Sequence, residues 1–349
     1  MSVIKPPAGS STPAAGSITV TMLNGTAAPS GNVASNPGFN FAQKQTPGTL
    51  TTIPNATYGP DCWKVERSAA DVQYQRLANA GSSWSGSANR GRFKQITNPG
   101  RMVIYQPLEN LLTLELASQS IAFQISCQNN VARNWRMALI NYSGAADTIP
   151  AMISDFTTSP MTLNANFAYL GSFIVNSDTN VQKFFLTLTP PNGGISNLIL
   201  AVMVESVMAV NDTIDLGEAA LNLGAVIRTY FQPLSPSEDL ARVERFYEKS
   251  YDIDTPPATV TLLGAVNGTQ VGTAATNPIR YRQRKPKNPA IALYSTATGT
   301  ALRWRDTTLN AELTVGAQNI GLAAAAVKVS AAGVNGDDFA GHYTLDSSL

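Results

Sequence analysis

Hydrophobic and polar residues alternate along much of the chain, which is the pattern of β-strands with one buried face. In "SIAFQISCQ" (residues 120–128), Phe123, Ile125 and Cys127 alternate with polar side chains. Strand-length segments of similar character recur as "RMVIYQPL", "LLTLELAS", "WRMALINYS", "FAYLGSFIV", "KFFLTLTP" and "NLILAVMVES", with turn-forming stretches such as "PPNGG" between them. Many short strands separated by turns predict an antiparallel β-sandwich of the jelly-roll type over residues 36–234.

A second strand-rich region follows, over residues 253–349. Its expected strands are "ATVTLLGAV", "NPAIALYST", "ALRWRD", "LTVGA", "VKVSAAGV" and "GHYTLDS". A segment of this length is sufficient for a small sandwich of its own. The predicted fold class is therefore mainly β, with a jelly-roll β-sandwich, one junction helix and a second, smaller β-sandwich.

The junction helix is predicted over residues 235–252, "SPSEDLARVERFYEKSYD". Ser235 is placed to cap the helix, and Glu238 completes a capping box. Leu240 and Val243 begin an apolar stripe at helical spacing. We expect Phe246 and Tyr247 to continue this helix and to pack against a sheet.

The first 35 residues are rich in Pro, Ala, Gly, Ser and Thr and contain hardly any charge. Such a segment has too little apolar surface to fold alone. Two interpretations compete: a disordered tail, or an extended arm that becomes ordered against a neighbouring subunit. Within it, "SITVTMLNGT" alternates and is a candidate edge strand.

Charge and composition narrow the class of protein. Only 13% of the 349 residues are charged and the net charge is +1, so no overall field favours nucleic acid or a membrane surface. The most apolar stretch is interrupted by Glu205 and is shorter than the roughly 20 residues of a membrane span. With no signal peptide at the N-terminus, we expect a soluble protein made in the cytoplasm, with Cys62 and Cys127 as reduced thiols.

Two parts of the chain carry a resemblance. The first reads "NPGFNFAQKQTPG", followed by "TYGPDCWKVE", and the second reads "FQPLSPSEDLARVERFYEKSYD". Together they resemble a family of bacteriophage and prophage structural proteins, often found near tail fibres. The residues that match are Asn40, Phe41, Gln43, Lys44, Asp61, Trp63, Phe231, Pro233, Arg245, Phe246, Tyr247, Glu248, Lys249 and Ser250. This sequence departs from the family at "VERFY" and "QKQTPG".

The resemblance implies a virion component whose jelly-roll is similar to carbohydrate-binding modules. It implies a tail-fibre, collar-fibre or capsid-decoration protein that is localised in the virion. A homotrimer is favoured, and the N-terminal arm is expected to contact other virion proteins. Two interpretations of its role stay open: binding of a host surface polysaccharide, and a purely structural role in the virion without a glycan ligand.

Catalytic constellations are scarce. His342 is the single histidine, and the sequence has no Gly-x-Ser-x-Gly elbow, P-loop or zinc-ligand spacing. We therefore predict that the protein is not an enzyme and uses no cofactor or metal. The alternative is a polysaccharide depolymerase based on two carboxylates. The candidate carboxylates are Asp61, Glu66, Glu109, Glu115, Asp155 and Glu205.

Two segments offer ligand or partner contacts. Trp84 lies among loop-forming residues in "AGSSWSGSANRGR", with Arg90 and Arg92 close behind it, and is the best candidate for an exposed tryptophan. Trp63 and Trp135 are expected in the core. The segment "NDTIDLGE" (residues 211–218) is predicted to be a polar turn rather than a calcium site.

The one basic run is "RYRQRKPK", residues 280–287. In a strand, alternation would place Arg280, Arg282 and Arg284 on one face. A solvated edge strand is the favoured interpretation, since positive charge discourages unwanted pairing. A subunit interface is a further option, and contact with nucleic acid is disfavoured because the run has a single aromatic residue and no second basic patch.

Overall fold

The computed structural model describes the chain from Asn32 onward. The described residues are 32–68, 71–79, 84, 86–224, 231–269, 276–329 and 336–349. Residues 1–31 of the predicted arm lie outside them. The remaining arm residues pack on the sandwich, where Ala34 is buried and the Asn32 side-chain amide donates to the Ala219 carbonyl at 2.7 Å.

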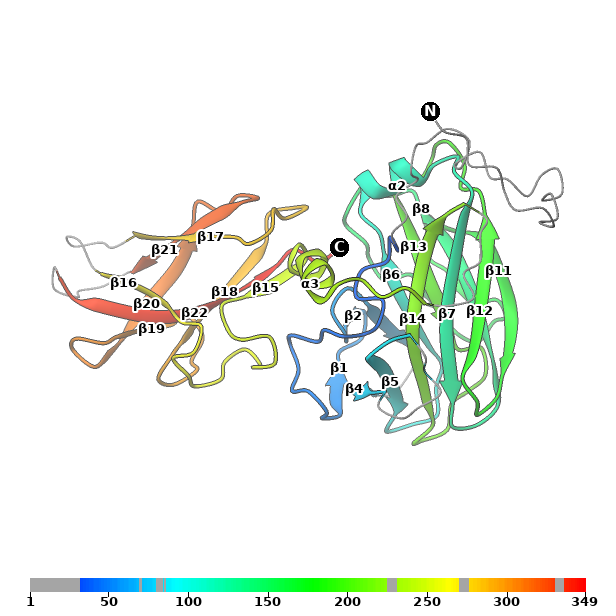
Figure 1. Ribbon diagram of the computed structural model, residues 1–349, viewed down its shortest axis with the longest axis horizontal. Helices are drawn as coiled ribbons and strands as arrows, with labels where there is room; N and C mark the ends of the chain where they lie inside the picture. Colours follow the sequence, from blue (N-terminus) through cyan, green and yellow to red (C-terminus); the bar gives the residue numbers. More distant parts are fainter. Residues whose placement is uncertain are drawn as a thin grey trace, which may run out of the picture. The chain divides into compact units, whose positions relative to one another are not determined.

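Two six-stranded antiparallel sheets form the first β region (Figure 1). Sheet A has the order β1 (Thr51–Ile53), β4 (Val72–Ala78), β5 (Asn89–Gln95), β14 (Thr213–Leu223), β7 (Ile121–Asn129) and β12 (Gln182–Leu188). Sheet B has the order β11 (Phe167–Ser177), β8 (Arg133–Tyr142), β13 (Asn197–Met203), β6 (Met102–Pro107), β3 (Lys64–Arg67) and β2 (Thr57–Tyr58). A separate pair consists of β9 (Ile153–Asp155) and β10 (Thr162–Leu163).

The main core lies between these sheets. Phe123, Ile125 and Cys127 of sheet A join Trp63 and Trp135 in one buried cluster, as their alternation predicts. Successive strands cross repeatedly from one sheet to the other, so the predicted sandwich of jelly-roll type is confirmed. Cys62 and Cys127 are buried and free, as expected.

In the described part of the second β region, eight strands surround a core of their own. They are β15 (Tyr247–Lys249), β16 (Val266–Thr269), β17 (Thr276–Arg280), β18 (Ala290–Ser295), β19 (Arg303–Asp306), β20 (Ala311–Gln318), β21 (Ala324–Val329) and β22 (Asp338–Asp346). Strand β20 pairs with β19 at its start and with β21 at its end, and Trp304 of β19 belongs to the buried core of this region. Whether the two β regions fold independently stays a prediction.

The junction helix is shorter than predicted. Helix α3 covers Pro236–Glu244, and Ser235 caps it by accepting a hydrogen bond from the Glu238 N–H at 3.3 Å. Tyr247 begins strand β15, which pairs with β22, so the predicted extension of the helix to residue 252 is wrong. Pairing with β22 provides hydrogen-bond partners for the backbone of β15 and buries its side chains. The stabilisation from this pairing exceeds what continuing the helix would provide.

Two further strand predictions fail. The segment "LLTLELAS" forms helix α2 (Asn110–Leu116), in which Thr113 and Leu116 are buried while Leu111 and Leu114 are exposed. Its buried positions are three residues apart, which is helical spacing and not strand alternation. In "ATVTLLGAV", only the final Val266 belongs to a strand. Neither α2 nor α3, the helices of the described residues, has the length and apolar character to cross a membrane.

Candidate functional site

The outer face of sheet A is unusually polar and yet largely buried. Because Phe123, Ile125 and Cys127 point into the core, the intervening Gln124 and Ser126 point outward. The strand register places Phe185 of β12 opposite Gln124, and Lys183 opposite Ser126. On the other side of β7, Gly217 of β14 lies opposite Ser126. We call this surface of β5, β14, β7 and β12 the outer face.

Three of the predicted contact residues come together at one end of the outer face. Arg92 makes two hydrogen bonds to the buried Asp215, at 2.7 and 2.9 Å, and Arg90 makes one at 3.0 Å. The hydrogen bonds to Asp215 raise the pKa of Arg92. The Arg90 guanidinium also lies 5.9 Å from the centre of the Trp84 ring.

Trp84 is not the exposed aromatic residue that the sequence suggests, since it is only 5% exposed. Its ring lies so close to Gly217 that a Cβ atom at that position would come within 2.8 Å of it. The Trp84 indole N–H lies 3.4 Å from the Gln128 side-chain oxygen and donates to it. Trp84 therefore covers part of the outer face instead of projecting from it.

Glu218 reaches this surface through a β-bulge. The pairing of β14 with β7 shifts between Gly217 and Ala220, and Glu218 has a φ of 51°. The bulge directs its carboxylate outward, where it accepts hydrogen bonds from the Ser126 hydroxyl at 2.7 Å and the Gly86 N–H at 2.8 Å. The predicted polar turn is wrong for Asp215 and Glu218, because both belong to β14. The sequence pattern does not reveal the bulge, so it does not predict this role of Glu218.

Gln124 is the most unusual residue of the outer face. It is 2% exposed, and neither its amide nitrogen nor its amide oxygen has a hydrogen-bond partner. The side-chain nitrogen of Asn222, on β14, is unpartnered too. Buried polar groups are nearly always hydrogen-bonded, so an unsatisfied amide is an unusual feature that calls for an explanation. Phe185, across the strand pair, is 46% exposed and presents an aromatic surface beside that amide.

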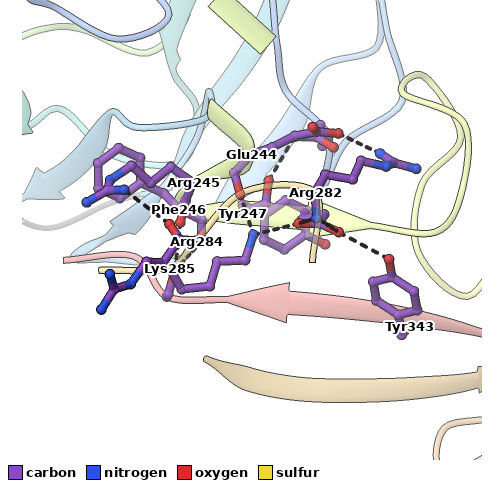
Figure 2. Close-up of polar contacts among 11 residues, drawn as sticks. Glu244, Arg245, Phe246, Tyr247, Arg282, Arg284, Lys285 and Tyr343 are labelled. Carbon is purple, nitrogen blue, oxygen red and sulfur yellow. Dashed lines mark hydrogen bonds and ion pairs between the residues drawn. The ribbon is translucent and has the colours of Figure 1, made fainter. Parts of the chain in front are cut away.

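The basic run occupies a different place, at the junction (Figure 2). Arg280 ends the edge strand β17, but residues 281–289 form no strand, so the predicted solvated edge strand is wrong beyond Arg280. Arg282 pairs with Glu244 at 2.5 Å, and Lys285 pairs with Glu248 at 2.8 Å. These ion pairs hold residues 282–285 against the rest of the protein. A charged side chain that is removed from water needs an opposite charge or hydrogen-bond partners to offset the loss of hydration.

Arg284 is exposed, and its carbonyl accepts a hydrogen bond from Arg245 at 3.2 Å. The structure thus brings Trp84, Arg90 and Arg92 together and places the predicted arginines 280, 282 and 284 in a separate region.

The carboxylates considered for catalysis are dispersed. Glu66 accepts from the Tyr105 hydroxyl and two backbone N–H groups, and Glu109 pairs with Arg245. Glu205 pairs with Arg136 at 2.5 Å. Burial raises the pKa of Asp61 to about 6, although the Gln43 N–H donates to it. Asp155 accepts hydrogen bonds from Thr157, and Glu115 is exposed on α2.

No family model and no curated protein sequence matches the chain. Among solved structures it is similar to TmCBM61 in complex with β-1,4-galactotriose, with 12% identity, a TM-score of 0.35, and coverage of 56% of this chain and 100% of that one. It is also similar to the C-terminal family 22 carbohydrate-binding module of Clostridium thermocellum Xyn10B, with 11% identity, a TM-score of 0.33, and coverage of 57% and 98%.

A third similar structure is the enzymatically active domain of bacteriophage CBA120 tailspike protein 4, with 9% identity and a TM-score of 0.33. That match covers 55% of this chain and only 21% of the tailspike chain. At such TM-scores these similarities establish neither fold nor function for this chain.

Proposed function

We propose that the protein binds carbohydrate, without cleaving it, on the outer face of sheet A. The observation that carries the proposal is the buried amide of Gln124, which has no partner and lies beside the exposed ring of Phe185. A sugar has an apolar ring face and a rim of hydroxyl groups. Phe185 offers a surface for the ring face, and the buried Gln124 amide would offer a donor and an acceptor to the hydroxyl groups once its side chain turns toward the ligand.

Neighbouring groups strengthen this assignment. Ser126 and Glu218 are hydrogen-bonded to each other, so their positions are fixed before a ligand arrives. Lys183 lies 3.6 Å from Glu218 and brings a positive charge to the same surface. A site whose polar groups are already ordered loses less entropy on binding than a flexible one.

The carboxylates of the outer face favour binding over hydrolysis, because their oxygens are already paired within the protein. A glycosidase needs one carboxylic acid and one carboxylate facing each other across the scissile bond. On the outer face, Asp215 is held by two arginines, and Glu218 accepts hydrogen bonds from Ser126 and Gly86. Both are committed to internal contacts, which supports a role in shaping the surface.

We further propose that the chain is a structural component of a bacteriophage particle, and a homotrimer, as the sequence resemblance implies. A single sandwich binds a sugar weakly, because a shallow site buries little area. Linked copies raise the overall affinity by about 10²–10⁴ without any new contact. A trimeric fibre or decoration protein would gain host attachment in this way.

The test is a glycan-array screen of the full-length protein, followed by a reducing-end assay on every glycan that binds. We expect binding without release of reducing ends. Phe185→Ala should abolish binding, whereas Ile174→Ala, which removes an exposed apolar side chain from sheet B, should leave it intact. Turnover that is lost when Asp215 or Glu218 is replaced by its amide would support the depolymerase alternative.

A further inference from the structure

A second cavity, of about 510 Å³, lies away from the outer face. It is bounded by β1, by β2 and by the residues that follow β22. Its lining includes the ammonium-bearing side chains of Lys44 and Lys64, the ring of Tyr58 and the hydroxyl-bearing Thr52 and Thr57. A cavity of this volume is in the range that holds small molecules.

The two lysines of this cavity differ in their partners: Lys44 forms an ion pair, and Lys64 forms none with the described residues. Lys44 pairs with Asp346 at 2.5 Å and also lies 4.6 Å from the centre of the Tyr247 ring. Lys64 is only 7% exposed, and its hydrogen-bond partner among the described residues is the Ile149 carbonyl, at 2.9 Å. No carboxylate of the described residues forms an ion pair with Lys64, although an ammonium group has three donors.

Two carboxylates, Glu66 and Asp346, lie near Lys64 without pairing with it, and Asp346 also lines the cavity. Lys287 disfavours its charged form, and Glu66 and Asp346 favour it. Glu66, however, is engaged by Tyr105, Met152 and Ile153, and Asp346 is engaged by Lys44. Tyr58 lies 5.3 Å from the ammonium and contributes only its ring, since its hydroxyl donates to the Leu349 main-chain oxygen.

We propose that this cavity binds an oxyanion, a carboxylate or phosphate group, through the free donors of Lys64. Water would satisfy those donors but would leave the buried charge without a counter-charge, whereas an oxyanion supplies both. Thr52 and Thr57 line the same cavity, so a ligand that also carries hydroxyl groups fits the polar character of the lining.

This site has a defined pH dependence. Burial lowers the pKa of Lys64 to about 8. The ammonium form predominates below that pH and is the form that attracts an anion. Affinity for an anion that stays ionised should therefore be at least about tenfold weaker near pH ~9.5 than near pH ~6.5.

The experiment is calorimetric titration of the full-length protein with sodium glucuronate, with inorganic phosphate and with glucose as a neutral control. We expect one or both anions to bind in a way that depends on Lys64. Glucose should show no binding that depends on Lys64, since any binding of glucose to the outer face would be unaffected by Lys64→Met. Binding of phosphate alone assigns the site to phosphate groups, binding of glucuronate alone assigns it to acidic sugars, and binding of both assigns it to the oxyanion itself.

Two variants place the binding in this cavity. Lys64→Met should weaken anion binding at least about tenfold. Lys328→Met removes the same charge from an exposed position on β21 and should change nothing. The proposal would be overturned if neither anion binds at about 10 mM. It would also be overturned if Lys64→Met binds the anions as tightly as the wild-type protein does.

If Lys64→Met does not fold, the wild-type protein still decides the question. NMR titration of the Lys64 side chain should show its pKa rise when glucuronate or phosphate is added. An unchanged Lys64 pKa in the presence of both anions would contradict the proposal.

Discussion

Lys285 and Glu248 form an ion pair that is closed to solvent: Lys285 Nζ lies 2.8 Å from Glu248 Oε2, and both side chains are 0% exposed. Lys285 also donates to the Glu244 carbonyl, and Glu248 accepts from the Tyr343 hydroxyl at 3.1 Å. The pair thus joins the basic segment to the end of α3, to β15 and to β22 (Figure 2). Burial lowers the pKa of Lys285, and its carboxylate partner opposes that shift.

Breaking this pair should be costly. Lys285→Met leaves Glu248 buried without its counter-charge, so the free energy of unfolding should fall by about 3–5 kcal/mol in urea denaturation. Arg284→Met is the matched control, because it removes a neighbouring positive charge whose side chain is exposed. The control should stay within about 0.5 kcal/mol of wild type. Equal losses in both variants would show that the ion pair is not what holds the segment in place.

Phe246 should contribute less than a core residue. The sequence predicts that it is buried, but the structure leaves it partly exposed at the edge of two apolar clusters. Phe246→Ala should therefore cost about 1–3 kcal/mol, below the 3–5 typical of a fully buried ring. A loss under about 0.5 kcal/mol would mean that α3 and the residues after it do not anchor on the sandwich.

Asp61 should make stability depend on pH. Burial raises its pKa from 3.8 to about 6, so the folded state binds more protons than the unfolded state between these values. Stability should consequently fall as the pH rises from about 4 to 6, by roughly 3 kcal/mol from this residue alone. Asp61→Asn keeps an acceptor for the Gln43 N–H and should remove that dependence. The opposite slope in the difference between wild type and variant would contradict the assignment.

Gly217 should be required for the position of Trp84. A Cβ atom there would lie 2.8 Å from the indole ring, so Gly217→Ala should displace Trp84 and alter the near-ultraviolet circular dichroism. Gly316→Ala is the control, since nothing lies within 4 Å of its Cβ position. It should be neutral or slightly stabilising. Unchanged spectra for both variants would mean that Trp84 does not pack on β14.

The sequence predicts local structure well where one pattern dominates. The alternation of Phe123, Ile125 and Cys127 gives β7 and its core face, and Ser235 gives the start of α3. The end of α3 depends on a partner far along the chain, because Tyr247 pairs with Asp346. No local pattern reveals that pairing, so the sequence predicts a helix that is longer than α3.

In the candidate site, too, local sequence patterns predict some features, whereas features that depend on strand pairing are not predicted. Trp84, Arg90 and Arg92 were selected together from one stretch and do meet in space. Gln124 and Phe185 were missed as site residues, because their adjacency comes from the pairing of β7 with β12. Glu218 was missed because a bulge determines its direction. The one available signal is the polar side of the alternating strand, Gln124 and Ser126, and alternation alone does not distinguish a ligand-binding face from an ordinary solvated one.

The central claim is that carbohydrate binds at the unpartnered amide of Gln124. The most direct measurement is a titration of labelled protein with a glycan identified on the array, following the side-chain amide NMR signals of Gln124. We predict that these signals shift progressively and saturate together with binding, because the ligand provides their missing hydrogen-bond partners. Saturable glycan binding that leaves the Gln124 signals unchanged would contradict the account.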